Sequence, residues 1–366
     1  MKKILAMALV LCMMFALCAT ASADSDVRVA MITDYGDITD QSFNQTTYEA
    51  CKEYAEANGI DFKYYKPGSD SDEDRISAIE DAIDENFNVI IMPGYAFGAA
   101  IRETAPQYDD ITFVALDVSD FDLGVQDGFV LPSNLYSAVY QEELCGYMAG
   151  YAAVKLGYTK LGFLGGMAVP AVVRYGYGFV QGADAAAAET GADVTLNYAY
   201  GNQFYGDADI TAAMDTWYGA GTEVVFACGG GIFTSVAEAA AKVGGKVIGV
   251  DVDQAPTIDS LYGEGMTVTS AMKGLGATVK SVLNSIVDGS FEGGKVENLG
   301  LVSEKSEENY VQLPASTQFG DGFTADDYAA LVADMFAGKI TVSNDTTVTP
   351  ADNAKTITVN DLGNIK

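Results

Sequence analysis

The sequence of 366 residues contains no histidine, and its 20 Lys and Arg are far outnumbered by 51 Asp and Glu. Without histidine, catalytic sites built on a histidine base are excluded, and the commonest zinc ligand is missing. The formal net charge of −31 would repel nucleic acids and anionic membrane surfaces, so neither is an expected partner. We expect neither a metal nor another cofactor.

Cysteine is also scarce, and two of the five cysteines, Cys12 and Cys18, lie in an N-terminal stretch with the parts of a secretion signal. The basic MKK is followed by the apolar ILAMALVLCMMFALCA and by the small residues ASA before Asp24. We therefore predict a signal peptide over 1–23 and export to the periplasm or the outer face of the cytoplasmic membrane. Lipid attachment at Cys18 is the less favoured alternative, because a small residue rather than Leu17 belongs before a lipid-carrying cysteine.

The three remaining cysteines are widely separated and odd in number, and they form no C-x-x-C pair. Cys51 and Cys145 fall in helical stretches, and Cys228 falls in a strand. This distribution favours buried free thiols, with a disulfide as the alternative and a metal site disfavoured.

Short β-rich runs alternate with helical stretches almost to the end of the chain. The first run, VRVAMIT, precedes a helix at 42–58, and the same pattern returns from KLGFLGG to TVTSAMK. This alternation predicts βαβ units with parallel sheets, and its two series predict an α/β fold of two doubly wound lobes with a hinge and an interdomain cleft. The expected parts are lobe 1 over 27–132 plus 266–300, lobe 2 over 133–265 plus part of 301–340, and a peripheral tail over 341–366.

The turns after the predicted strands are candidate site positions, because ligands of open parallel sheets bind beyond the carboxyl ends of the strands. Glycine there would let the backbone approach a ligand closely, but no turn carries the G-K-[ST] end of a phosphate loop. The candidates are the Asp34–Asn44 stretch, PGYAFG, Asp117, GGMAVP, YGNQFYGD, CGGGIF, VDVDQ and Lys273.

Taken in order, these stretches resemble the basic membrane protein family of ABC-transporter substrate-binding proteins, which includes the purine-nucleoside receptor lipoproteins. The similar stretches, between about Val27 and Val302, include VAMITDYGDITDQSFNQTTYEA, VIIMPGYAFGAAIRETAPQYDDITFVALD, YQEELCGYMAGYAA, KLGFLGGMAVPAVVRYGYGFVQGA, VIGVDVDQ and TVTSAMK. The resemblance implies a type I periplasmic-binding-protein-like fold that holds a nucleoside, a purine by preference, between its lobes. It further implies a monomer that delivers this ligand to a membrane permease without catalysis.

The resemblance implies a role for the mouth of the first helix. Phe43 would stack on the base, a contact of about 1–3 kcal/mol, while Asn44 and Asp40 would meet the polar base edge. The same residues can also be explained without a ligand. Phe43 also falls at helical core spacing, and Ser42 with Gln45 has the pattern of a capping box.

The other implied site residues come from the second half of the pattern. Phe204 would cover the second face of the base, with Tyr205 as its rival, and Asp117 would meet the base or the ribose, unless it only caps a helix. Asp251 suits a ribose diol because a carboxylate accepts two hydroxyl hydrogens. Lys273 would donate to ribose oxygens or pair with Asp251, and an ordinary surface lysine is the alternative.

Two other functions are compatible with the sequence. An exported nucleoside or sugar hydrolase could use Asp251 and Asp253 as acid and base. Against it, the two residues are two apart at a strand end and can point in different directions, and we find no group to activate a leaving group. A binding protein of the same fold for a sugar or a signalling molecule is the third hypothesis. Because the candidate site has one cation and several carboxylates, we expect a nucleotide to bind worse than a nucleoside.

Overall fold

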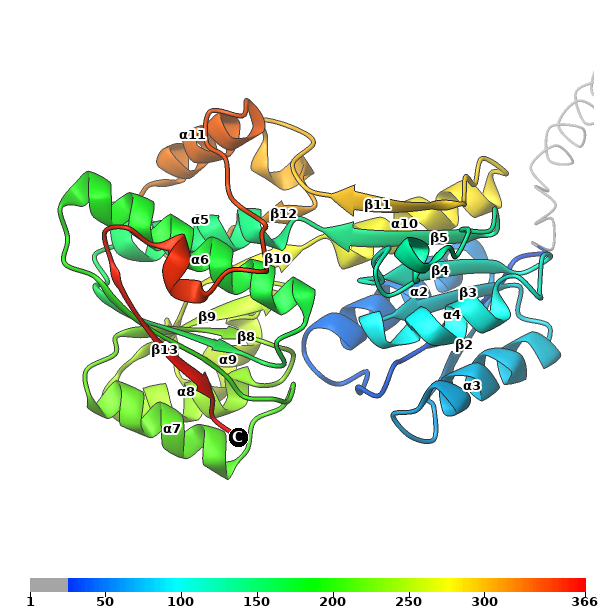
Figure 1. The fold of residues 1–366 in the computed structure, drawn as a ribbon, viewed down its shortest axis with the longest axis horizontal. Helices are drawn as coiled ribbons and strands as arrows, with labels where there is room; N and C mark the ends of the chain where they lie inside the picture. Colours follow the sequence, from blue (N-terminus) through cyan, green and yellow to red (C-terminus); the bar gives the residue numbers. More distant parts are fainter. Residues whose placement is uncertain (1–25) are drawn as a thin grey trace, which may run out of the picture.

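The computed structural model describes residues 26–366, which form two α/β lobes side by side (Figure 1). The predicted signal peptide over 1–23, with Cys18, lies outside the described residues. Within them, no helix is both long and apolar enough to cross a membrane. Cys51, Cys145 and Cys228 are buried free thiols, as predicted.

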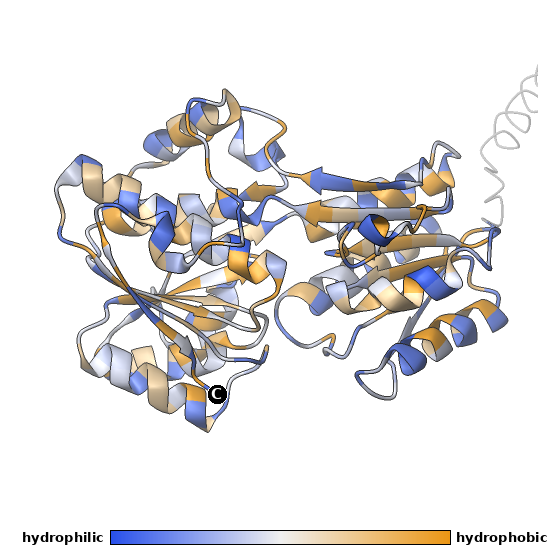
Figure 2. Cartoon of the chain, in the orientation of Figure 1, coloured by the Kyte–Doolittle hydropathy of each residue, from blue (hydrophilic) through white to orange (hydrophobic). Residues whose placement is uncertain are grey.

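The first lobe is built on a six-stranded parallel sheet. Its strands, in sheet order, are β11 (Lys295–Leu299), β5 (Leu135–Tyr140), β4 (Thr112–Leu116), β3 (Val89–Pro93), β1 (Arg28–Ile32) and β2 (Asp61–Tyr65). Its helices are α2 (Phe43–Asn58), α3 (Asp72–Asp84), α4 (Gly98–Thr104) and α10 (Leu275–Val287). Alternate residues of β1 belong to different cores: Val29 packs in the core with α2 and α10, and Ala30 in the core with α3 and α4. Helices therefore cover both faces, which is why the central strands are apolar throughout (Figure 2).

The second lobe is built on a seven-stranded sheet. Its strands, in sheet order, are β12 (Val311–Gln312), β10 (Thr267–Lys273), β9 (Lys246–Asp251), β8 (Val224–Cys228), β6 (Lys160–Gly165), β7 (Thr195–Tyr200) and β13 (Thr358–Asn364). Its helices are α5 (Glu142–Lys155), α6 (Pro170–Thr190), α7 (Ala208–Gly219), α8 (Phe233–Val243), α9 (Ala255–Tyr262) and α11 (Ala325–Phe336). Only β12 runs antiparallel to its neighbour. Short 3₁₀ helices in the chain are Tyr95–Phe97, Val125–Asp127, Ser306–Glu308 and Pro350–Asn353.

The two sheets repeat one strand order. β2-β1-β3-β4-β5 in the first lobe corresponds to β7-β6-β8-β9-β10 in the second, so β4 is equivalent to β9, and β5 to β10. This confirms the predicted class of two doubly wound lobes. In each sheet the second strand of this order along the chain lies on one side of the first strand, and the third strand lies on the other side. Folds of this class bind their ligands at this point, where the strand order reverses.

The chain passes between the sheets after β5, after β10 and between β11 and β12. β5 therefore lies in the first sheet and β10 in the second, whereas the boundaries drawn from the sequence put 133–140 in lobe 2 and 266–273 in lobe 1. The difference arises because each crossing separates a strand from its own helix, which the alternating pattern does not reveal. The expected peripheral tail also supplies β13, a strand of the second sheet.

Helices α5 and α6 pack together unusually closely, through glycines spaced four apart on each helix. A Cβ atom at Gly146 or Gly150 would overlap the backbone of α6, and one at Gly178 or Gly182 would overlap the backbone of α5. The backbones are in contact, so the interface has no space for a methyl group. α5 follows directly from β5 of the first lobe and packs on α6 of the second, so this interface helps to fix the position of the second lobe relative to the first.

We predict that Gly150→Ala destabilises the protein by about 1–3 kcal/mol despite the better helix propensity of alanine, because the methyl group forces the helices apart. Urea unfolding would measure the loss. Gly219→Ala, at the end of α7 with no atom within 4 Å of the added Cβ, is the matched control and should be neutral or slightly stabilising. Equal stabilities for the two variants would contradict the close contact.

Candidate functional site

A cavity of about 630 Å³ lies between the lobes. Loops after β1, β3 and β4 line it from the first lobe, and loops after β6, β7 and β8 with the ends of β9 and β10 line it from the second. The volume is in the range of roughly 300–1,000 Å³ typical of small-molecule sites. All seven residues expected at the site line this cavity, namely Asp40, Phe43, Asn44, Asp117, Phe204, Asp251 and Lys273.

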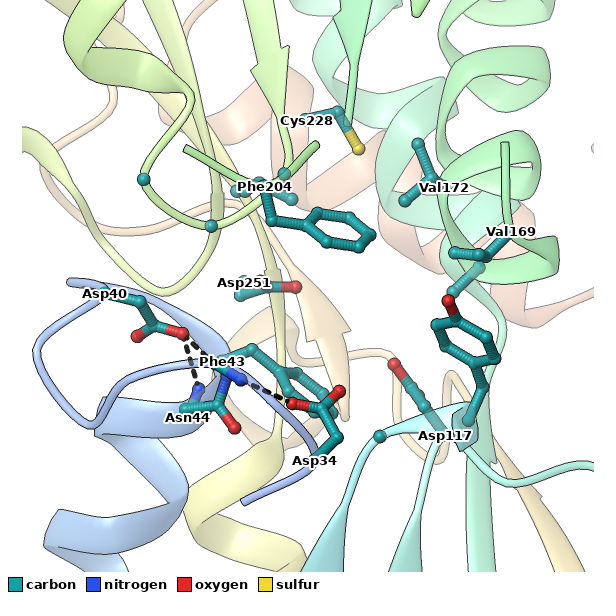
Figure 3. Close-up of a pocket in the computed structure, with 18 of the residues that line it drawn as sticks. Asp34, Asp40, Phe43, Asn44, Asp117, Val169, Val172, Phe204, Cys228 and Asp251 are labelled. Atoms are coloured by element: carbon teal, nitrogen blue, oxygen red, sulfur yellow. Dashed lines mark hydrogen bonds between the residues drawn. The ribbon is translucent and has the colours of Figure 1, made fainter. Parts of the chain in front are cut away.

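Two phenylalanine rings reach the cavity from different lobes (Figure 3). Phe43 is the first residue of α2, and it both packs on the core and lines the cavity. Phe204 comes from the loop after β7, and its ring fills the space over Gly166 and Gly229, where a Cβ would lie about 2.5 and 3.1 Å from a ring carbon. Tyr205, which the sequence offered as the alternative to Phe204, is 63% exposed. The glycines therefore seat the Phe204 ring, a role different from the close approach to ligand that the sequence suggested.

Asp40 caps α2 with its carboxylate, and this corrects the expected capping box. It accepts hydrogen bonds from the backbone N–H groups of Ser42, Asn44 and Gln45 at 2.9–3.0 Å. The Ser42 hydroxyl makes no cap and instead donates to Asp251, and the Gln45 side chain accepts from the Gln41 backbone. Burial raises the pKa of Asp40, against the effect of these hydrogen bonds.

The cap also orients the side chain of Asn44. Its Nδ2 donates to Asp40 Oδ2 at 3.1 Å, which turns Oδ1 away from Asp40. Asn44 Oδ1 is buried without a hydrogen-bond partner. Buried polar atoms are normally paired, so this oxygen is a free acceptor at the cavity wall. The sequence placed Asp40 at the base edge beside Asn44, whereas the carboxylate of Asp40 is already engaged by the helix.

Lys273 is a buried cation surrounded by carboxylates and not a surface lysine. Its Nζ lies 2.5 Å from Asp117 Oδ2, 3.4 Å from Glu142 Oε1 and 3.6 Å from Asp251 Oδ1. It also lies 4.9 Å from the centroid of the Phe43 ring. Burial by itself would lower the pKa of Lys273, but the three carboxylates outweigh burial and raise it, so the lysine stays charged. Its N–H groups are engaged by protein.

Asp117 and Asp251 occupy equivalent strand ends in the two lobes and share an unusual backbone conformation, with φ of 59° and 64°. Such left-handed residues are uncommon outside glycine and gather at functional sites. Burial raises the pKa of Asp117 to about 6, against the opposing effect of Lys273. Asp117 Oδ1 is buried without a partner. Asp251 accepts from Ser42 Oγ of the other lobe at 2.6 Å and from the Tyr175 hydroxyl at 3.4 Å.

Sequence reasoning gave no individual role to three charged residues of this region, although Asp34 falls in the candidate Asp34–Asn44 stretch. Asp34 lines the cavity, and burial raises its pKa although it accepts hydrogen bonds from the two following backbone N–H groups. Its position directly after a predicted strand was a usable signal. Glu142 and Arg174, joined at 2.7 Å, lie in helices, where no strand-end rule points to them. Six aspartates but only one lysine and one arginine line the cavity, so the site is acidic.

The two doubly wound lobes and the cavity between them define a small-molecule-binding protein of the periplasmic-binding-protein fold. Solute-binding proteins of ABC transporters have this architecture. One from Aeropyrum pernix K1 matches with a TM-score of 0.66 and 20% identity over 89% of this chain and 90% of its own. Another from Conexibacter woesei DSM 14684 matches with a TM-score of 0.65 and 23% identity over 87% of this chain and 99% of its own.

Residues 27–315 match the family model Bmp, described as ABC transporter substrate-binding protein PnrA-like, and the chain belongs to this family. The resemblance noted from the sequence is thereby confirmed. Among curated relatives, the ABC transporter nucleoside-binding protein BmpA of Lactococcus lactis subsp. cremoris (strain MG1363) is 28% identical over 81% of this chain and 88% of its own. Basic membrane protein A1 of Borrelia garinii subsp. bavariensis is 28% identical over 82% of this chain and 86% of its own. The protein is thus an ABC-transporter substrate-binding protein, a class that works outside the cytoplasm.

We predict that Lys273→Met lowers the free energy of unfolding at pH 7 by about 3–5 kcal/mol, because the buried carboxylates lose their counter-ion. Lys273 lowers the pKa of Asp117, so without the cation this carboxyl binds a proton more readily, and the deficit should shrink as the pH falls towards 5. Urea unfolding across this pH range is the measurement. Lys280→Met is the control, since its 3.0 Å pair with Glu53 is exposed and should matter by less than about 1 kcal/mol. Similar losses for both lysines would show that the cluster is well solvated.

Proposed function

We propose that this protein captures a nucleoside, preferably a purine nucleoside, between its two lobes and delivers it unchanged to an ABC permease in the membrane. The observation that carries the proposal is the pair Phe43 and Phe204, two aromatic rings contributed by different lobes to one cavity. A flat base between them would gain about 1–3 kcal/mol for each stack. The nucleoside-binding relative from Lactococcus lactis supports the same ligand class.

The free polar atoms of the cavity suit the edges of a nucleoside. Asn44 Oδ1 and Asp117 Oδ1 are buried acceptors that lack a partner, and a ligand must bring N–H or O–H donors to them. We assign Asn44 to an N–H of the base edge, and Asp117 and Asp251 to the ribose hydroxyls. Asp40 contributes by holding Asn44 in this orientation.

Lys273 has a different part in this arrangement from the one expected. Its ammonium is already bound by the three carboxylates, so we assign it to hold Asp117 and Asp251 in place, with no direct contact to ribose. The excess of aspartates around the cavity would repel a phosphate, which supports a nucleoside over a nucleotide.

Hydrogen bonds between the lobes at the cavity stabilise a form that is closed around the ligand. Ser42 of the first lobe donates to Asp251 of the second, and Gln254 Nε2 of the second lobe donates to the Gln41 carbonyl at 3.1 Å. A ligand that contacts both lobes adds to these contacts only when the lobes are together, and so favours the closed form. We propose that the permease recognises this form.

The hydrolase hypothesis required Asp251 and Asp253 to act as a pair. Asp253 is absent from the cavity wall, and its carboxylate accepts from Ser316 Oγ at 2.7 Å and from the Ala255 N–H at 3.1 Å. Because Asp253 does not line the cavity with Asp251, the two carboxylates favour a binding protein over a hydrolase. A sugar, with its many hydroxyl donors, remains the alternative ligand, and the panel of ligands below distinguishes it.

We predict that adenosine, guanosine or inosine binds the refolded, ligand-free protein at micromolar concentration or tighter. At a hundredfold excess over Kd such a ligand stabilises by about 2.7 kcal/mol, which a melting curve resolves, with calorimetry to give Kd. Ribose, galactose and AMP should produce little shift, and 2′,3′-dideoxyadenosine should bind much more weakly than adenosine. A shift with galactose and none with any nucleoside would replace the ligand and keep the fold.

We predict that nucleoside affinity falls about tenfold between pH 7.5 and pH 5. Lys273 occupies Asp117 Oδ2, so the proton taken up near pH 6 goes to Oδ1 and removes the acceptor. The charged form binds, and its population in the free protein falls tenfold for each pH unit below its pKa. Asp117→Asn should bind weakly with a flat profile, and Asp253→Asn should keep the wild-type profile. Unchanged wild-type affinity down to pH 5 would exclude Asp117 as the acceptor.

A further inference from the structure

The C-terminal segment beyond the family match, from about residue 343 onward, is attached along the second lobe (Figure 1). The Gln181 side chain on α6 exchanges hydrogen bonds with the backbone of Ser343 at 2.8 and 2.9 Å. Asp184, one turn further along α6, accepts hydrogen bonds from three successive backbone N–H groups, those of 355–357. These anchors lead the chain into β13, which pairs in parallel with β7.

The end of this segment reaches the loop that carries Phe204. After β13, the Ile365 N–H donates to the Tyr200 carbonyl at 2.8 Å, so the pairing continues to the last residue of β7. Asn202 Nδ2 then donates to the backbone oxygen of Lys366 at 2.8 Å. Asn202 has a φ of 57°, a conformation that needs support in a residue other than glycine. Asparagine adopts this conformation more readily than most residues, and Asn202 is bonded here both by its side chain to Lys366 and by its N–H to the Gly166 carbonyl at 3.0 Å.

The Lys366 side chain contacts the Phe204 loop on both sides of the phenylalanine. Its ammonium forms an ion pair with Asp207 and lies 3.3 Å from Gln203 Oε1. Gln203 in turn donates to the Tyr205 carbonyl and to Asp207. One lysine thus connects the residue before Phe204 to the residue at the cap of α7.

The inner side of the loop is held by other means. The Phe204 carbonyl accepts from the Gly231 N–H at 2.9 Å, and the ring rests over Gly166 and Gly229. The loop therefore lies between the glycine-rich turns on its inner side and residues 365–366 on its outer side. Loss of the contacts with residues 365–366 would let the Phe204 ring move away from Gly166 and Gly229.

We propose that Ile365 and Lys366 are positioning residues for ligand binding, which hold the 201–207 loop so that Phe204 presents its face to the cavity. They do not line the cavity themselves. The affinity part of this inference rests on the proposed nucleoside function, but the order of the loop does not. It places a determinant of affinity outside the part of the chain shared with the family model, 27–315.

The test compares Lys366→Met with Lys355→Met, a matched change of an exposed lysine in the same segment. We expect Lys366→Met to raise the Kd for adenosine about twofold to fivefold, the range for loss of one partly exposed ion pair. Hydrogen–deuterium exchange of 201–207 in the ligand-free protein should become faster, with the melting temperature unchanged. Lys366→Arg should restore both values, and Lys355→Met should match the wild type.

Asn202→Gly is the second variant, because glycine tolerates the backbone conformation while it removes the bond to Lys366. It should also speed exchange in 201–207. Wild-type exchange and Kd in both variants would overturn the inference, as would faster exchange spread evenly over the whole second lobe. If the wild-type protein binds no nucleoside, the proposed function fails, and exchange of the loop still decides the positioning role.

Discussion

The structure depends above all on one buried cation among three buried carboxylates. Lys273 ends β10 in the second lobe, Asp117 directly follows β4 in the first, and Glu142 begins α5 at a crossing between them. In a medium of low dielectric these carboxylates would repel one another strongly without the lysine. The cation therefore couples the position of one lobe to the other at the inner end of the cavity. It also leaves Asp117 with one engaged oxygen and one free oxygen, which defines the acceptor offered to a ligand.

The repeated strand order explains why equivalent residues meet. β4 and β9 occupy the same place in their sheets, and an aspartate with positive φ stands at the carboxyl end of each, Asp117 just after β4 and Asp251 as the last residue of β9. Two lobes of the same construction, facing each other by the carboxyl ends of their strands, present paired acceptors to the space between them. The chain of Ser42, Asp251 and Lys273 then joins these acceptors across the lobes.

The two aromatic walls of the cavity are held by different means. Phe43 depends on the start of α2, which the carboxylate of Asp40 caps through three backbone N–H groups. Phe204 depends on a loop whose ring rests over Gly166 and Gly229, the glycines that follow β6 and β8. The first device lies in the N-terminal stretch shared with the family, whereas the second has contacts from the segment after residue 315.

The sequence by itself determined the two doubly wound lobes, because strand–helix alternation is a local pattern, and it placed the candidate site residues in turns at the carboxyl ends of strands. The choice of seven residues among those turns came from the family resemblance, and all seven line the cavity. Only the tertiary structure decided which sheet receives β5 and β10, since every buried strand has the same apolar pattern. It also decided that Asp40 caps a helix and that Lys273 is bound by Glu142 as well as by aspartates. The role of Lys273 depends on charges that meet over long distances in the chain, and no spacing in the sequence records that meeting. The cap by Asp40 is local, with bonds from backbone groups two to five residues ahead, but the choice of Asp40 over Ser42 as the capping side chain appears only in the structure.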